Sequence, residues 1–581
     1  MKMKKINFSF FRLLFAGLVV LAAFNSNAQT LSRTDDTLKT KDVVIVKEFE
    51  PVISEAFKIN DNPRIVDTLK SQTGELSYTT LKKQIDTEFE VLPIRAAVMK
   101  GEPLEKLYKA YARGGYGLYN TALGELYINN LRSRTKNYGF RANHLSSTGN
   151  IKNVGYSGYS NTSAELYGKQ IFYNKILSGA GSYSYDRYHF YGFDTRVDTI
   201  GLPTDFYADT LAKNAIQQNF QKMAGEVRFK SYFRDSNLVN FDLYARGYNV
   251  KDAFNANETN VKFTGALDRF YDENQIFLNF GADYNQYQNS LGTFNNTLIN
   301  LEPAFATGGE KWRVKLGLRT FVNADTITTF KAYPIAFASY NLVGNYMVPY
   351  VGYEGNLSRN NFDQLRQTNP FLQNDQAVAV SNNKYKVYGG VRGQFSSNSS
   401  FNLKASQELI ENYALFVNDY SNLVANRFLV VYDTAEVTTL TAEFSYQQKE
   451  KLNIYGRGDY FIFNMQREAR AWHTPDFRGT LGATYDLQDK IMLKAEFSYI
   501  SKQYAKSYNP ADGEAVGYGA YAKELKGLVD INLGAEYRYN KNISGWISLQ
   551  NLASMNYERW NLYPTQGFLG MLGFTYSFIS R

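Results

Sequence analysis

The chain ends with the stretch G-F-L-G-M-L-G-F-T-Y-S-F, from Gly567 to Phe578. Alternate positions are apolar or aromatic: Phe568, Leu572, Phe574, Tyr576 and Phe578. The positions between the last of these are small or polar: Gly573, Thr575 and Ser577. Side chains of a β-strand point alternately to its two faces, so one face of this strand meets an apolar environment and the other does not.

The same period of two recurs upstream, most clearly in the stretches 239–246, 276–284, 312–319, 491–499 and 529–539. An aromatic-rich final strand resembles the closing strand of bacterial outer-membrane β-barrels. A soluble β-sandwich also alternates, with its apolar face turned inward. A soluble propeller or solenoid is the other alternative for a chain with 46 Tyr and 41 Phe. The alternation alone does not separate these classes.

The connections between the strands separate them. Some are tight and charged: 234–237, 308–311, 448–451, 487–490 and 540–542. The connections between these are long: 191–220, 360–383, 418–434, 505–524 and 553–566. Tight turns at one rim and long loops at the other are typical of an outer-membrane barrel. We therefore predict an all-β fold, a transmembrane antiparallel barrel whose apolar alternates face lipid.

Counting back from the last strand gives about 22 strands, with an error of about two to four. The first three are predicted near 111–119, 123–130 and 138–146. An even number places both ends of the barrel at the rim with the tight turns, which is the periplasmic rim.

The N-terminus predicts export. Lys2, Lys4 and Lys5 precede the apolar run 13–24, and Ser26-Asn27-Ala28 provides a cleavage site, so the mature chain begins at Gln29. Removing the four basic residues of this signal lowers the formal net charge from +9 to +5, which gives no basic stripe for nucleic acid. We expect three regions: signal peptide 1–28, a small periplasmic N-terminal segment 29–103 and a barrel 104–581.

The residue content argues against an enzyme. There is no Cys, which excludes disulfides, thiol catalysis and a lipoprotein anchor, and the three His are His144, His189 and His473. They are far apart in the chain, so no zinc or iron site and no other cofactor is expected. Only Asp186-Arg187-Tyr188-His189 brings His and Asp together, and we interpret it as a polar rim rather than as part of a membrane-embedded hydrolase.

Charged residues on the polar faces of the strands are the candidate site. They are Arg313, Lys315, Arg319, Arg457, Asp459, Lys494, Glu496, Glu536 and Arg538. One interpretation is a solvated lumen wall with paired charges. The other is that these charges dock a plug or the segment 29–103. Wall side chains cannot fill a barrel of this width, so something else must occupy the lumen. A docked plug or the segment 29–103 would do so.

The signal peptide, the N-terminal region and the Tyr/Asn-rich strands, including Tyr111–Gly117 and Gly124–Asn130, resemble TonB-dependent receptors of the Bacteroidota. Asp42-Val43-Val44-Ile45-Val46 resembles a TonB box, which pairs edge-on with a TonB-type energising protein. The segment 29–103 is shorter than the family's plug domain, so the resemblance implies a reduced or missing plug.

The resemblance implies a cell outer membrane location, with the N-terminal segment periplasmic and with lipid and lipopolysaccharide around the barrel. It also implies uptake of an unidentified nutrient. The alternative is a non-transporting structural or accessory barrel of a larger outer-membrane complex, with a periplasmic or surface lipoprotein as partner.

Overall fold

In the computed structural model, the described residues are 108–130, 133–196, 211–231, 238–344, 346–376, 378–422, 424–449, 451–517 and 519–579. The chain divides into a unit of residues 1–100 and a unit of residues 101–581, and the description concerns the second. The predicted signal peptide, the segment 29–103 and the TonB-box-like residues lie outside the described residues.

Twenty-two strands form one antiparallel sheet. Their bounds are β1 Tyr108–Gly117, β2 Thr121–Asn129, β3 Lys136–Ser147, β4 Tyr159–Ile171, β5 Lys175–His189, β6 Gln217–Ser231, β7 Asn240–Lys251, β8 Asn257–Tyr271, β9 Asn274–Asn289, β10 Gly292–Gly308, β11 Trp312–Ala324, β12 Thr329–Tyr340, β13 Val348–Arg359, β14 Val380–Ser396, β15 Ser399–Asn418, β16 Phe428–Gln448, β17 Leu452–Met465, β18 Phe477–Leu487, β19 Ile491–Ile500, β23 Leu528–Arg538, β24 Ile543–Gln550 and β27 Leu569–Ile579.

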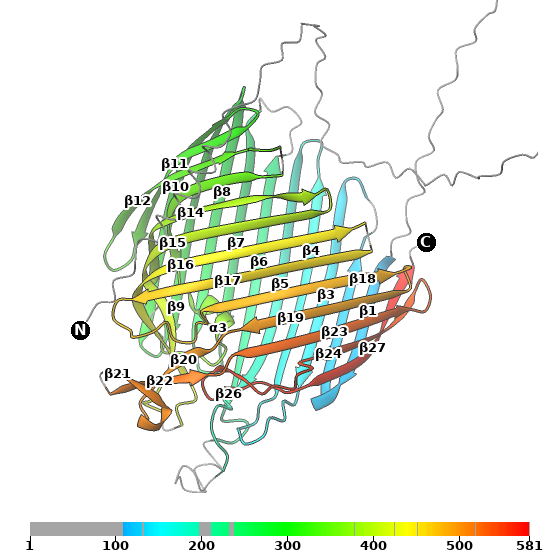
Figure 1. Ribbon diagram of the computed structural model, residues 1–581, viewed down its shortest axis with the longest axis vertical. Helices are drawn as coiled ribbons and strands as arrows, with labels where there is room; N and C mark the ends of the chain where they lie inside the picture. Colours follow the sequence, from blue (N-terminus) through cyan, green and yellow to red (C-terminus); the bar gives the residue numbers. More distant parts are fainter. Residues whose placement is uncertain are drawn as a thin grey trace, which may run out of the picture. The chain divides into compact units, whose positions relative to one another are not determined.

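The sheet closes on itself, because the last strand β27 pairs with β1 as well as with β24 (Figure 1). In the closing register Gly115 lies opposite Gly573. A Cβ added at Gly573 would lie 2.2 Å from the carbonyl oxygen of Gly114, so glycine permits the close approach of these strands. The predicted fold, including the strand number and the role of the final stretch, is confirmed.

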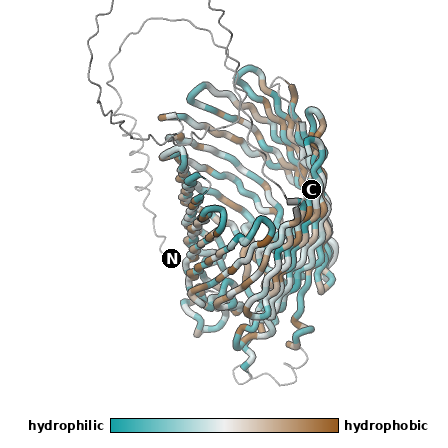
Figure 2. Tube along the Cα trace, turned by 90° about the vertical axis from the view of Figure 1, so that its right-hand side faces the viewer, coloured by the Kyte–Doolittle hydropathy of each residue, from teal (hydrophilic) through white to brown (hydrophobic). Residues whose placement is uncertain are grey.

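The apolar alternates of the strands face outward. Leu572 and Phe574 of the final strand are 65% and 75% exposed. The same holds for the predicted lipid-facing residues Ile276, Leu316, Leu493, Phe497, Leu533 and Tyr537. Figure 2 shows the resulting alternation of hydrophobic and hydrophilic positions along the wall. An outward apolar face on a closed barrel is the arrangement that lets strands cross a membrane.

The two rims differ as predicted over most of the barrel, although the second rim also has short connections such as 290–291 and 325–328. At one rim neighbouring strands are joined by tight turns such as 272–273, 309–311 and 488–490. At the other lie the loops 148–158, 360–379, 419–427, 501–527 and 551–568. Predicted loop 418–434 was too long, because the alternating residues from Phe428 onward already pair with β15. Throughout, we call the first rim the turn rim and the second the loop rim.

The loops at the loop rim carry their own structure. β20 (Gln503–Ser507), β21 (Gly513–Gly517) and β22 (Ala520–Leu525) form a three-stranded sheet in the loop 501–527, and β25 (Glu558–Trp560) pairs with β26 (Tyr563–Pro564). The helix α3 (Phe362–Thr368) lies in the loop 360–379. In the described part of the chain, the helices are all too short or too polar to cross a membrane.

Candidate functional site

The loop 360–379 folds inward at the loop rim and packs against lumen-facing residues of the wall. It leaves β13, forms α3 behind the front wall of strands in Figure 1, and returns to β14. Asn361 caps the helix by accepting a hydrogen bond from the Gln364 N–H at 2.9 Å, as asparagine commonly does at this position. Phe362 and Leu365 of the helix are buried against lumen-facing residues of the wall.

A buried carboxylate holds the start of α3. Glu258, at the loop-rim end of β8, is 0% exposed and accepts hydrogen bonds from the Phe362 N–H at 2.6 Å and the Asp363 N–H at 3.2 Å. The Tyr248 hydroxyl donates to Glu258 at 2.7 Å and accepts from the Asn361 amide at 2.7 Å. A negative charge at a helix N-terminus is favourable because the first N–H groups of a helix lack partners.

Charged residues of the wall hold the helix from two sides. Asp363 forms an ion pair with Lys222 of β6 and accepts a hydrogen bond from Arg366 at 2.6 Å. Arg366 also lies 3.6 Å from Asp186 of β5. Burial by itself raises the pKa of Asp363, but Arg366 and Lys222 together hold that pKa below its usual range. The helix is therefore attached to the wall by side chains of three strands, β5, β6 and β8.

An aromatic cluster joins α3 to the other loops. The ring of Phe371 stacks on Tyr563 at 3.7 Å, and Tyr191 meets Tyr563 edge-on at 4.8 Å. The Tyr563 hydroxyl donates to the carbonyl of Asn426, and the Asn426 amide donates to the carbonyl of Phe190 at 2.8 Å. The loops 360–379, 419–427 and 551–568 thus form one packed layer, which we call the mouth layer.

His473, in the connection between β17 and β18, packs against the mouth layer as a neutral residue. Its Nδ1 donates to the carbonyl of Phe416 at 2.9 Å, and its Nε2 accepts from the Asn561 N–H at 3.2 Å. Burial lowers the pKa of His473 to about 4. Protonation would add a second donor facing the Asn561 N–H, so this contact requires the neutral ring.

Residues of the predicted Asp186–His189 stretch contact the loops at the loop rim. Asp186 pairs with Arg366, and His189 is buried with its Nδ1 donating to the carbonyl of Gly158 at 2.6 Å. His144 lies elsewhere on the wall, 2.8 Å from Thr162. Among the described residues no three His, Asp or Glu side chains gather as metal ligands do.

The predicted lumen charges bind mostly to the wall. Arg319 contacts Glu302 at 2.6 Å, and Lys315 lies 3.8 Å from the same carboxylate. Arg457 contacts Glu443 at 2.7 Å and Asp459 at 3.0 Å. Glu496 accepts a hydrogen bond from the Tyr455 hydroxyl at 2.9 Å, and Glu536 accepts one from the Ser544 hydroxyl at 2.5 Å. Arg538 lies 3.5 Å from the Asp486 carboxylate. The backbone of Lys494 pairs with Gly534 of the neighbouring strand. Whether they also dock a plug stays a prediction.

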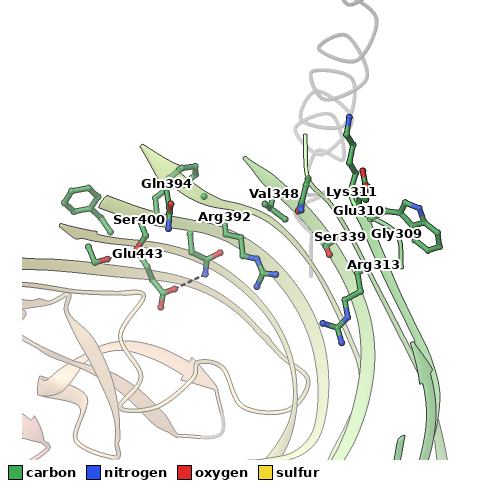
Figure 3. Close-up of a pocket in the computed structure, with 17 residues that line it drawn as sticks. Gly309, Glu310, Lys311, Arg313, Ser339, Val348, Arg392, Gln394, Ser400 and Glu443 are labelled. Atoms are coloured by element: carbon green, nitrogen blue, oxygen red, sulfur yellow. Dashed lines mark hydrogen bonds between the residues drawn. The ribbon is translucent and has the colours of Figure 1, made fainter. Parts of the chain in front are cut away.

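Arg313 differs from the rest, because it lines a cavity of about 730 Å³ at the turn rim. Figure 3 shows the guanidinium groups of Arg313 and Arg392 reaching into the same space from β11 and β14. Within the described part of the chain neither guanidinium forms an ion pair; Arg313 donates to Gln275 at 3.2 Å and Arg392 lies 5.6 Å from the Tyr350 ring. Lys311, Glu310 and Glu443 also line the cavity, which therefore offers two guanidinium groups without ion pairs in a lining of mixed charge.

Sequence reasoning missed Arg392 and the residues that hold α3: Lys222, Glu258 and Arg366. For Arg392 a signal was present, since it alternates with Val391 and Gly393 and so belongs to a strand face. For Glu258 there was none, because its partners in α3 lie more than 100 residues away in sequence. The TonB-box-like residues 42–46 lie outside the described residues.

Comparison with known proteins finds solved structures with a similar fold. No protein-family model and no curated protein matches the chain. Among solved structures, the FrpB iron transporter from Neisseria meningitidis matches with a TM-score of 0.62 at 11% identity, covering 82% of both chains. The ferric-catecholate import receptor Fiu from Escherichia coli K12 matches with 0.58 at 13% identity over the same shares. The siderophore receptor PirA from Acinetobacter baumannii matches with 0.59 at 10%, covering 82% of this chain and 81% of that one.

These structural neighbours are TonB-dependent receptors with a 22-stranded barrel, and they are transport receptors rather than enzymes. At these identities the likeness concerns the fold of the barrel. It places the chain among barrels of outer-membrane type.

Proposed function

We propose that this protein is an outer-membrane transporter that takes up a nutrient through its lumen and opens by releasing the mouth layer. The observation that carries the proposal is the way the loop 360–379 is held inside the loop-rim end of the barrel. A 22-stranded barrel is too wide for its wall side chains to fill. Here ion pairs and hydrogen bonds attach the loop to the lumen-facing side of the wall.

A loop held in this way could act as a gate. The contacts to α3 are non-covalent and come from a few side chains, so a ligand that binds the open loops better than the closed ones can shift the equilibrium. The structural neighbours include an iron transporter, a copper transporter, a ferric-catecholate import receptor and a siderophore receptor, which supports transport as the general class.

We further propose that residues 29–103 close the lumen from the periplasmic side and bind the predicted lumen charges. Arg313 and Arg392 are the strongest candidates, since they face one cavity and lack carboxylate partners among the described residues. The segment offers acidic partners in Glu48-Phe49-Glu50 and Glu88-Phe89-Glu90. Asp42–Val46 would then remain available to a TonB-type energising protein.

Single-channel conductance in planar bilayers tests the proposal. Four proteins are compared: the full-length chain, a deletion of 29–103, a variant in which a Gly/Ser linker replaces 362–376, and the combination of both changes. Two closures in series predict that the first three proteins conduct little and that the combination conducts as a large pore.

Other results have defined meanings. A large pore in the linker variant alone would contradict the plug role of 29–103 while leaving the mouth layer as the gate. A large pore in the deletion alone would contradict the gate. A combination that stays closed would contradict transport through the lumen.

The alternative is an accessory barrel that does not transport. A combination variant that stays closed would favour this second function.

A further inference from the structure

A second cavity, of about 490 Å³, lies between the barrel wall and the mouth layer. The wall contributes residues from the loop-rim ends of β4, β5, β23 and β24, and the mouth layer contributes Phe371 from one loop and Tyr557 from another. Sites for small molecules commonly have volumes of about 300–1,000 Å³. This cavity therefore has the size of a ligand site, and it lies at the opposite end of the strands from the cavity around Arg313.

Hydrogen bonds hold the loop side of this cavity in place. The Asn551 side chain donates to the carbonyls of Met555 and Gln566, both at 3.0 Å. The Gln566 amide in turn donates to the Ser147 hydroxyl of β3 at 3.0 Å. The loop 551–568 is thus fixed both to itself and to the wall, so the cavity is formed before any ligand enters.

Three buried acceptors of the cavity lining lack a donor. His189 is 3% exposed, and because its Nδ1 donates to the carbonyl of Gly158, its Nε2 is an acceptor. Within the part of the chain that the structure describes, nothing donates to this Nε2, to Oδ1 of Asn161 or to Oδ1 of Asp530. The other Asp530 oxygen accepts from the Asn532 amide at 3.2 Å. An unmet buried acceptor costs about 1–3 kcal/mol, so the lining favours a molecule that brings hydrogen-bond donors.

The charges of the lining favour an uncharged molecule. Of the described residues around the cavity, Asp530 is the sole acid and Arg559 is the sole base. An ion that leaves water needs an opposite charge or several hydrogen bonds in its new site. Here one positive and one negative side chain offset each other, so neither an anion nor a cation is favoured over a neutral ligand.

Aromatic rings complete the lining. Tyr159, Tyr188 and Tyr557 are half-buried around the cavity, and the buried Phe371 adds a fourth ring. A tyrosine offers a flat apolar face together with a polar tip. A purely apolar ligand could use the faces but would leave the three acceptors unpaired. A sugar has both features that the lining requires, since its hydroxyl groups are donors and its C–H groups form an apolar face.

We propose that this cavity binds a neutral carbohydrate. Its hydroxyl groups donate to the unpaired acceptors of Asn161, His189 and Asp530, and the C–H face of a sugar ring packs on a tyrosine of the lining. That this carbohydrate is the nutrient taken up rests on the proposed function, whereas the binding site itself does not.

Native mass spectrometry of the full-length protein in detergent tests the binding. The probes are a panel of neutral di- and trisaccharides of glucose, galactose, mannose and xylose, and a matched panel in which one sugar is a uronic acid. We expect at least one neutral member to bind with a Kd of about 1 mM or tighter, and its uronic-acid counterpart to bind about tenfold more weakly. If no neutral member binds, water alone satisfies the acceptors and the proposal is wrong. Tighter binding of the uronic acids would contradict the neutral class.

Three variants locate the site. Asp530→Leu replaces an unpaired acceptor with an apolar side chain of similar size, and it is expected to weaken binding of the best probe about tenfold or more. Tyr557→Leu removes a stacking face in the loop and is expected to weaken binding about fivefold, which keeps the test decisive if Asp530→Leu fails to fold. Glu226→Leu is the matched control, because Glu226 of β6 also accepts a hydrogen bond, from Tyr244 at 2.8 Å, but lies outside the cavity lining.

The control variant is expected to bind the probe as wild type does. Unchanged binding in both Asp530→Leu and Tyr557→Leu, or an equal loss in Glu226→Leu, would contradict this cavity as the site. The conductance experiment separates this inference from the proposed function. Sugar binding by a protein whose combination variant stays closed would support the site and contradict transport, whereas a conducting combination variant without sugar binding would retain transport and overturn the site.

Discussion

At the scale of single residues, Glu258 decides whether α3 stays in the mouth. Its carboxylate accepts from two helix N–H groups and from Tyr248 while it is fully buried. Glu258→Ala leaves these donors without a partner, which costs about 2 kcal/mol and corresponds to roughly a 30-fold larger open fraction of the mouth. Single-channel recordings of the variant lacking 29–103 measure that fraction.

The matched control is Glu496→Ala. Glu496 also accepts from a tyrosine hydroxyl, that of Tyr455, but it lies on β19 away from α3. It is expected to leave channel opening unchanged. Equal opening in the two variants would show that the loss of a wall carboxylate, and not release of the helix, opens the pore.

His473 makes the mouth layer sensitive to acid. Its pKa in the folded protein is about 4, below the ordinary value of 6.5. The unfolded chain therefore binds a proton between pH 6.5 and pH 4 while the folded one does not, so stability is fully present above pH 6.5 and falls as the pH falls through this window. The loss reaches about 3 kcal/mol near pH 4.

Thermal unfolding of wild type and His473→Gln between pH 7.5 and pH 4 measures this effect. Glutamine keeps a donor for Phe416 and an acceptor for Asn561 but does not titrate here. We expect the wild type to lose more stability on acidification than the variant does. Parallel losses in the two proteins would assign the acid sensitivity to other groups.

At the scale of elements, the loops of the mouth layer pack on one another as well as on the wall. Tyr563 of β26 stacks on Phe371 and is 1% exposed. Tyr563→Ala removes a large buried ring, at a cost of about 3–5 kcal/mol. Since Arg366 is only 5% exposed, trypsin does not reach it in the closed layer, and the variant is expected to be cleaved after Arg366 when trypsin is added to the loop-rim side.

Tyr508→Ala is the control, because Tyr508 lies in the loop 501–527 and is 51% exposed, in edge contact with Tyr420 alone among the described aromatics. Its cleavage rate after Arg366 is expected to match wild type. An equally slow rate in Tyr563→Ala would mean that the wall contacts of α3 suffice without the aromatic stack.

The strands could be predicted and the mouth layer could not, for one physical reason. In a wall strand such as β23, side chains alternate between lipid and lumen, so apolar residues such as Leu533 and Tyr537 identify the lipid-facing side from the local sequence alone. The start of α3 depends on Glu258 and Lys222, which are adjacent only after the barrel has closed. The candidate charges show the same limit: Arg313 was visible as a lumen residue, but its neighbour Arg392 across the cavity follows from the curvature of the closed wall.

At the scale of the whole molecule, energised transport requires a link between the barrel and a periplasmic partner, and Asp42–Val46 is the predicted link. Edge-on strand pairing depends on backbone N–H donors, and proline removes one. Val44→Pro is therefore expected to weaken binding of the full-length protein in nanodiscs to the soluble C-terminal domain of a TonB-type protein at least tenfold. Val44→Thr keeps the donor and the β-branched shape and is expected to bind as wild type does. Equal binding of all three proteins would show that residues 42–46 do not make the contact, and the barrel would then be a passive channel or an accessory subunit rather than an energised importer.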